Sequence, residues 1–98
     1  MKIPEQMPEK GLYYHFKHDP NGPVQNYAYE VLGVARHSES GEYLVVYRPL
    51  YKNTYLDAVD YSARPLAMFM EEVTRDGTTF PRFKRITDPA IIAKLQGL

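Results

Sequence analysis

The chain has 98 residues, of which 44% are apolar and 24% charged, and its 12 basic and 12 acidic side chains give a formal net charge of zero. That length allows one domain, and the neutral total argues against a dedicated polyanion binder, although a local basic patch can lie within it. Because the chain contains no cysteine, a disulfide scaffold, a thiol nucleophile and any cysteine-based metal site are excluded.

The first ten residues contain Pro4 and Pro8, which fix φ and favour an extended backbone. We expect residues 1–10 to form an extended arm and residues 11–98 to form a single domain. No hydrophobic stretch follows Lys2, so the segment is not a secretory signal, and no run approaches the roughly 20 apolar residues of a membrane span. These features predict a cytoplasmic protein with no membrane partner.

The first half of the chain has the composition of β-strands, because tyrosine and phenylalanine favour half-buried pleated surfaces. The sequence predicts strands at 12–17, 27–37 and 42–50, with the last two joined by a turn at 38–41 in which Gly41 takes a positive φ. Gly33 in the middle of a strand indicates a bend or bulge. Strict alternation places Tyr27, Tyr29, Val31, Gly33 and Ala35 on one face and Glu30, Leu32, Val34 and Arg36 on the other.

The second half of the chain is predicted to contain short strands and helices. A loop from Tyr51 is expected to run into a short strand near 59–64. Apolar side chains then recur at helical spacing and predict a short helix near 65–74: Leu66, Phe69, Met70 and Val73. A strand at 78–86 follows, and Pro81 marks it as an edge strand.

A C-terminal helix is predicted near 89–96, capped by Asp88 and ended by Gly97. Its apolar residues Ile91, Ile92 and Leu95 can pack on the same domain or on a second copy, which would make a homodimer. Together these elements predict a mainly β fold, a small barrel of about five strands, because closure removes exposed strand edges. A sheet with one packed helix, of the α+β class, is the alternative.

Five separated blocks occur in order: Gly11-x-Tyr13-x-His15-Phe16-Lys17, Tyr29-x-Val31-Leu32-x-x-Ala35-Arg36-His37-Ser38-Glu39, Val45-Val46-Tyr47-x-x-Leu50-Tyr51, Arg64-Pro65-x-x-Met68-Phe69 and Pro81-Arg82-Phe83. With these blocks the chain resembles the bacterial family known as domain of unknown function 1653, from Gly11 to about Ile86. The resemblance implies a small SH3-like β-barrel and implies no activity. Where such sequences usually carry a bulky residue before the Arg-Pro block, this chain has Ala63, with Tyr61 nearby.

Tyrosine and arginine concentrate binding energy at interfaces, and the arginine fork fits phosphate and carboxylate. The first hypothesis is therefore a non-enzymatic binding module for a peptide, a single-stranded nucleic acid or another anionic partner. The candidate ligand-binding residues are Tyr13, His15, Arg36, Tyr47, Arg48, Tyr51, Arg64 and Arg82. The alternative for this set is structural, with the tyrosine rings in the core and the guanidinium groups stacked on them.

A second hypothesis is a small enzyme or metal-assisted hydrolase centred on His15, His37 and Glu39. Consecutive residues in a turn do not easily take the geometry of a catalytic triad, so a hydrogen-bonded turn is the simpler interpretation of residues 37–39. A metal ion would need three or four converging ligands, whereas His15 and His18 face opposite sides of a regular strand. We therefore assign no catalytic residue, no metal and no cofactor.

Residues 80–85 (FPRFKR) interleave basic and aromatic side chains, as nucleic-acid surfaces do. In a neutral chain the simpler interpretation is an edge strand protected by charge and proline, although the basic residues could still contact an anion. A third hypothesis is an assembly domain that associates through the C-terminal helix.

Overall fold

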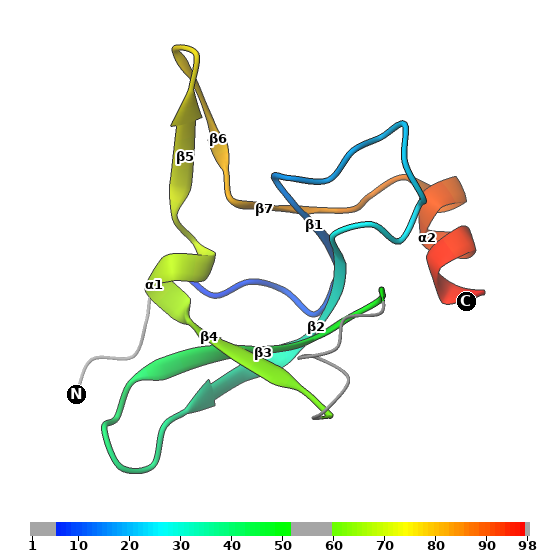
Figure 1. The fold of residues 1–98 in the computed structure, drawn as a ribbon. Helices are drawn as coiled ribbons and strands as arrows, with labels where there is room; N and C mark the ends of the chain where they lie inside the picture. Colours follow the sequence, from blue (N-terminus) through cyan, green and yellow to red (C-terminus); the bar gives the residue numbers. More distant parts are fainter. Residues whose placement is uncertain (1–5, 52–59, 98) are drawn as a thin grey trace.

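A computed structural model describes residues 6–51 and 60–97. In these residues the elements are β1 (Gly11–His15), β2 (Ala28–Arg36), β3 (Tyr43–Pro49), β4 (Ser62–Pro65), α1 (Leu66–Phe69), β5 (Glu72–Arg75), β6 (Thr78–Pro81), β7 (Phe83–Arg85) and α2 (Pro89–Gln96). Five strands form one antiparallel sheet in the order β4-β3-β2-β1-β7, and β5 and β6 form a separate hairpin that projects from it (Figure 1). The fold is mainly β with a short helix and a C-terminal helix, as predicted.

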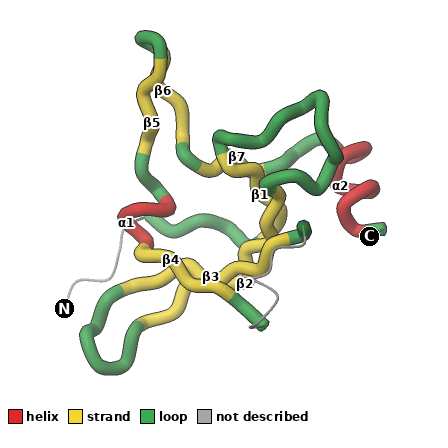
Figure 2. The backbone as a smooth tube through the Cα atoms, viewed as in Figure 1, coloured by secondary structure: helices red, strands yellow, loops and turns green. Residues whose placement is uncertain are grey.

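The five-stranded sheet is not closed. Within the described part of the chain, β4 pairs only with β3 and β7 pairs only with β1, so the two edges do not meet in a hydrogen-bonded ladder. In place of barrel closure, α1 and the β5–β6 hairpin lead from β4 to β7 (Figure 2). Arg82 ties this connection to the sheet: its N–H donates to the Glu71 carbonyl at 2.9 Å and its own carbonyl accepts from the Phe16 N–H at 2.8 Å.

A β-bulge lies in the middle of β2. Val31 pairs with Tyr47 and Gly33 pairs with Val46, so Leu32 is an extra residue on this strand. The bend predicted at Gly33 is therefore confirmed. Strict alternation is wrong beyond it, because one extra residue inverts the two faces, and Val34 packs against the same core cluster as Val31.

The helix predicted near 65–74 is a single turn, Leu66–Phe69, and Val73 lies in β5 instead. The reason is the two-residue turn that follows, in which Asp76 and Gly77 have φ values of 51° and 77°. An Asp-Gly pair with positive φ at both residues is a strong hairpin signal, and the hairpin prevails over the helical spacing. The strand predicted at 78–86 is likewise interrupted at Arg82, which separates β6 from β7.

The sheet packs on both faces. One face carries a largely aromatic core of Tyr13, Tyr29, Val31, Val45, Tyr47, Leu66, Phe69 and Phe83. The other face carries Ala28 and Ile86, which are covered by Leu95 of α2. The apolar side of α2 thus packs on its own sheet, one of the two arrangements that its pattern allows.

Both predicted ends of α2 are confirmed, since Asp88 accepts the Ala90 N–H at 2.9 Å and Gly97 is the C-cap. Neither of the helices in the described residues has the length or the apolar character needed to cross a bilayer.

Candidate functional site

Two of the predicted ligand-binding residues are core residues. Tyr13 and Tyr47 are each 6% exposed and belong to the aromatic cluster. The Tyr13 hydroxyl donates to the backbone carbonyl of Glu9 at 2.8 Å, which satisfies its polar end. For these two side chains, the packing alternative stated above fits the structure.

Two further candidates are exposed and lie on the strands of the β2–β3 pair. Arg48 lies opposite Glu30 across the β2–β3 ladder, and the two side chains form an ion pair. Arg36 is the last residue of β2, beside the turn that leads to β3. An exposed ion pair such as that of Arg48 contributes little to stability. Arg36 lies outside the cluster described next and serves below as a reference cation.

The remaining four candidates, His15, Tyr51, Arg64 and Arg82, gather around the aromatic core where β1, β4 and β7 end. The guanidinium of Arg64 lies over the Phe83 ring, 5.0 Å from its centroid. The His15 ring meets the edge of the same Phe83 ring at 5.0 Å. The Phe83 ring thus connects the imidazole and the Arg64 cation.

His15 is the buried polar residue among those described, with 9% of its surface exposed. Its Nδ1 accepts the Lys17 backbone N–H at 3.2 Å, so the neutral ring carries its proton on Nε2. Burial, followed by the positive charges of Arg64, Arg82 and Lys17, lowers the pKa of His15 from 6.5 to about 4. The imidazole is therefore neutral near pH 7 and lies in positively charged surroundings.

Tyr27, beside His15, has an unusual backbone. Its φ of 53° is rare for a large side chain, and the residue is 37% exposed. Its ring stacks on His15 at 5.7 Å and approaches Tyr51 at 5.8 Å. Such strain is often found at functional sites, and no local sequence signal predicted it here.

Tyr51 is anchored by a second tyrosine. Its hydroxyl shares a hydrogen bond with that of Tyr29, and the two rings meet edge to face at 5.5 Å. Burial, together with this hydrogen bond, raises the pKa of Tyr29, so its hydroxyl stays protonated at physiological pH. Tyr51 is thus half-buried in the wall of the aromatic core.

Arg82 continues this arrangement toward the β5–β6 hairpin. Its guanidinium lies 5.8 Å from the Phe16 ring and donates to the Glu71 carboxylate at 3.2 Å. Arg75, on β5, places a second guanidinium 4.9 Å from the same ring, and the Phe80 ring lies 6.0 Å away. Arg82 is half-buried, and its buried Nε has no hydrogen-bond partner among the described residues. Arg75, in contrast, is exposed.

We define the basic–aromatic corner as His15, Phe16, Arg64, Arg75, Phe80, Arg82, Phe83 and Lys84. A hollow of about 260 Å³ opens on its outer side, lined by Tyr14, His15, Phe16, His18, Phe80, Pro81 and Lys84. Within the hollow, the rings of Tyr14 and His18 stack 3.5 Å apart. The predicted edge strand at 80–85 therefore supplies part of this surface, and β7 is indeed an edge of the sheet.

Arg75 was not predicted as a site residue. Its place beside Phe16 depends on the hairpin turn at Asp76 and Gly77, and this Asp-Gly pair is the signal that could have indicated it. Phe16 itself lay within the predicted first strand and carried no separate signal. The interleaved pattern of residues 80–85 and the candidates His15, Arg64 and Arg82 were the sequence features that pointed to this side of the molecule.

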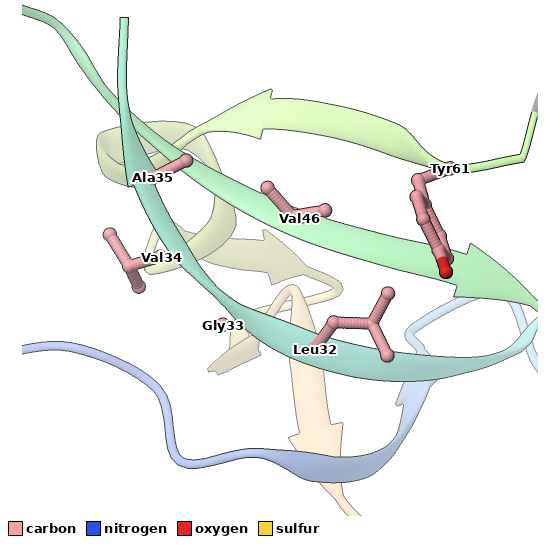
Figure 3. Close-up of a pocket in the computed structure, with 6 residues that line it drawn as sticks. All are labelled: Leu32, Gly33, Val34, Ala35, Val46 and Tyr61. Carbon is pink, nitrogen blue, oxygen red and sulfur yellow. The ribbon is translucent and has the colours of Figure 1, made fainter.

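A larger hollow of about 440 Å³ lies on the outside of β2 and β3. Figure 3 shows its lining residues Leu32, Gly33, Val34, Ala35, Val46 and Tyr61. None of these residues is charged, and none is a predicted ligand-binding residue. The Tyr61 ring, 56% exposed, borders this hollow, and we use it below as a reference aromatic residue.

The residues of the hydrolase hypothesis do not converge. His15 bonds to Tyr27 at one end of β2, whereas His37 follows the other end, about 30 Å away along the strand at 3.3 Å per residue. The Nδ1 of His37 accepts the backbone N–H groups of Glu39 and Ser40, each at 3.1 Å, which makes the turn expected at 37–39. In residues 6–51 and 60–97, no three His, Cys, Asp or Glu side chains are grouped to hold a metal.

Comparison with known proteins identifies a family whose function is not known. The family model described as a protein of unknown function, DUF1653, matches residues 11–85. The chain is also similar to the crystal structure of a protein of that family from Bordetella bronchiseptica, with 31% identity and a TM-score of 0.61, over 82% of this chain and 92% of that one. No curated protein matches the chain.

Proposed function

Because the chain belongs to the DUF1653 family, whose function is unknown, its activity must be inferred from its own surface, and we propose that it is a non-enzymatic binding module. In this proposal, the basic–aromatic corner holds an anionic partner. The observation that carries it is the clustering of three guanidinium groups over aromatic rings. Arg64 lies over Phe83, and Arg75 and Arg82 lie over Phe16.

This arrangement suits anion binding because an aromatic face orients the guanidinium plane and leaves its N–H edge free to donate. Burial lowers the pKa of His15 most, and the charges of Arg64 and Arg82 lower it further, so both guanidinium groups act on the same point of the corner. One bordering carboxylate, Glu71, is engaged by Arg82. Arg75 and Lys84 are exposed and are the cations that we expect a partner to meet first.

The contacts of His15 favour binding over catalysis. Among the described residues its ring touches Phe16, Tyr27 and Phe83, and its Nδ1 is occupied by a backbone N–H. A general base needs a free nitrogen near a nucleophile, and a ring with Nδ1 occupied and a pKa near 4 is a weak base. We therefore assign His15 a positioning role within the basic–aromatic corner, where its ring contacts Phe16, Tyr27 and Phe83.

The test measures binding of anionic probes by fluorescence anisotropy: an oligo-glutamate peptide, an oligodeoxythymidylate and an oligouridylate of 12 units each. The double variant Arg75→Ala/Lys84→Ala is expected to bind the best probe at least tenfold more weakly. The matched control Arg36→Ala/Lys94→Ala makes the same change of charge outside the corner and is expected to bind as the unaltered chain does. Equal losses in both variants, or no probe bound at 1 mM protein, would overturn the proposal.

A further inference from the structure

The outer side of the basic–aromatic corner combines two features that single-stranded nucleic acid requires. Phe80 offers a half-buried ring, and a base can stack on such a ring whatever its identity. The Phe16 ring lies 6.0 Å from it and carries the guanidinium groups of Arg75 and Arg82 over its face. Arg75 and Lys84 flank these rings and are exposed, so they can contact the phosphates on either side of a stacked base. We propose that this hollow is a binding surface for single-stranded nucleic acid, an inference that rests on the proposed function.

The size of the hollow favours part of a polymer over a free metabolite. About 260 Å³ lies below the roughly 300–1,000 Å³ of pockets that enclose small molecules. It is an open surface with an aromatic floor, and it suits one or two bases of a longer strand. Within it the stacked rings of Tyr14 and His18 extend the aromatic lining beyond Phe16.

A duplex does not fit this chemistry, because its bases are stacked on one another and present no free faces. An extended peptide would be expected to add to a free sheet edge. The edge strands that line the hollow, β6 and β7, have four and three residues, which offer few main-chain hydrogen bonds to such a peptide. The aromatic faces therefore favour a single strand over an acidic peptide.

The carboxylates around the surface do not oppose this partner. Glu71 is paired with Arg82, and Asp19 accepts the backbone N–H of Asn21. Asp76 lies in the hairpin turn beyond Arg75. The hollow itself is lined by Lys84 and His18 and by no acidic residue.

The test compares a labelled 12-mer of deoxythymidylate, a 12-mer of uridylate, a duplex of the same length and the oligo-glutamate peptide, at several salt concentrations. The two single strands are expected to bind more tightly than the duplex and the peptide. The logarithm of their binding constant should fall linearly with the logarithm of the salt concentration, with a slope near −0.7 for each phosphate contacted. The Arg75→Ala and Lys84→Ala variants should each reduce that slope.

Phe80→Leu and Phe16→Leu keep an apolar side chain and remove the aromatic face. Phe80→Leu tests ring stacking and is expected to weaken single-strand binding by about tenfold, in line with the stacking contribution of one base. Phe16→Leu removes the ring beneath the Arg75 guanidinium and is also expected to weaken binding. Tyr61→Leu removes an exposed ring from the other hollow and should leave binding unchanged. Thermal unfolding of each variant shows whether the fold is retained, and a variant that has lost its fold is replaced by Phe→Met at the same position.

The outcomes separate the two proposals. If the oligo-glutamate peptide binds as tightly as the single strands, or if folded Phe→Leu variants bind normally, the nucleic-acid inference is wrong and the anion-binding module stands. If no anionic probe binds, both are wrong. If Tyr61→Leu weakens binding as much as Phe80→Leu, stacking in this hollow is not the cause.

Discussion

At the scale of single residues, His15 couples the core to the charges of the corner. It is 9% exposed, and its pKa is lowered to about 4 by burial and by three nearby cations. In the unfolded chain the same imidazole titrates near 6.5. Between these values the unfolded state binds more protons than the folded state, so acid favours unfolding.

We therefore expect the free energy of unfolding to be highest above pH 6.5 and to decline as the pH falls through 6 and 5 toward 4. The contribution of His15 to this decline is at most about 1.4 kcal/mol per pH unit, the value for one proton. Urea denaturation at a series of pH values measures it. His15→Phe should flatten the curve in this range, whereas His37→Gln, at an exposed turn, should not. An unchanged curve for His15→Phe would show that the imidazole does not titrate as inferred.

At the scale of elements, the β5–β6 hairpin determines which residues meet. It carries Arg75 to Phe16 and Phe80 into the same hollow. Both central residues of its turn have positive φ, and a Cβ added at Gly77 would meet open space, so a substitution there tests backbone strain alone. The left-handed conformation costs a residue other than glycine roughly 1–2 kcal/mol.

Gly77→Ala is expected to destabilise the hairpin by that amount, which corresponds to about a 5–30-fold loss of amide protection at Arg75 and Thr78, the pair beside the turn, measured by hydrogen exchange. Asparagine tolerates positive φ, so Gly77→Asn should lose much less. Equal losses for the two variants would indicate that side-chain bulk, and not backbone conformation, is responsible.

Elements with local signals were predictable from the sequence, and elements that depend on competition between signals were not. The turn at Gly41 and the cap at Asp88 involve residues close in sequence, so the β2–β3 hairpin and α2 were predicted correctly. The apolar spacing that ends at Val73 favours a helix, and the hairpin turn at Asp76 and Gly77 overrides it.

The candidate site shows the same limit. The sequence singled out His15, Arg64 and Arg82 by residue type, and the structure brings them together. It could not place Arg75 beside Phe16, because that contact depends on how the hairpin folds back across the end of β1. Nor could it separate tyrosines of the core, such as Tyr47, from tyrosines of a surface, since residue type is the same in both.

At the scale of the whole molecule, each face of the five-stranded sheet packs against its own hydrophobic core. The aromatic core lies on one face, and α2 covers the other through Leu95, which is 3% exposed and packs with Ala28 and Ile86.

Leu95→Ala leaves a cavity between helix and sheet, and we expect it to lower the free energy of unfolding by about 2–4 kcal/mol. Lys94→Ala, on the exposed side of the helix, should change it by less than about 0.5 kcal/mol. Urea denaturation distinguishes the two, and equal small effects would mean that α2 contributes little to the fold.

The position of α2 has a consequence for how members of this family are divided into fragments. The family match ends at residue 85, whereas the helix that shields one face of the sheet begins at Pro89. A fragment cut at the limits of the match would leave Ala28, Leu12 and Tyr14 without their cover. Exposed apolar patches promote self-association, so such a fragment is expected to aggregate more readily than the chain that includes α2. The smallest unit suitable for partner screens is therefore wider than the region by which the family is recognised.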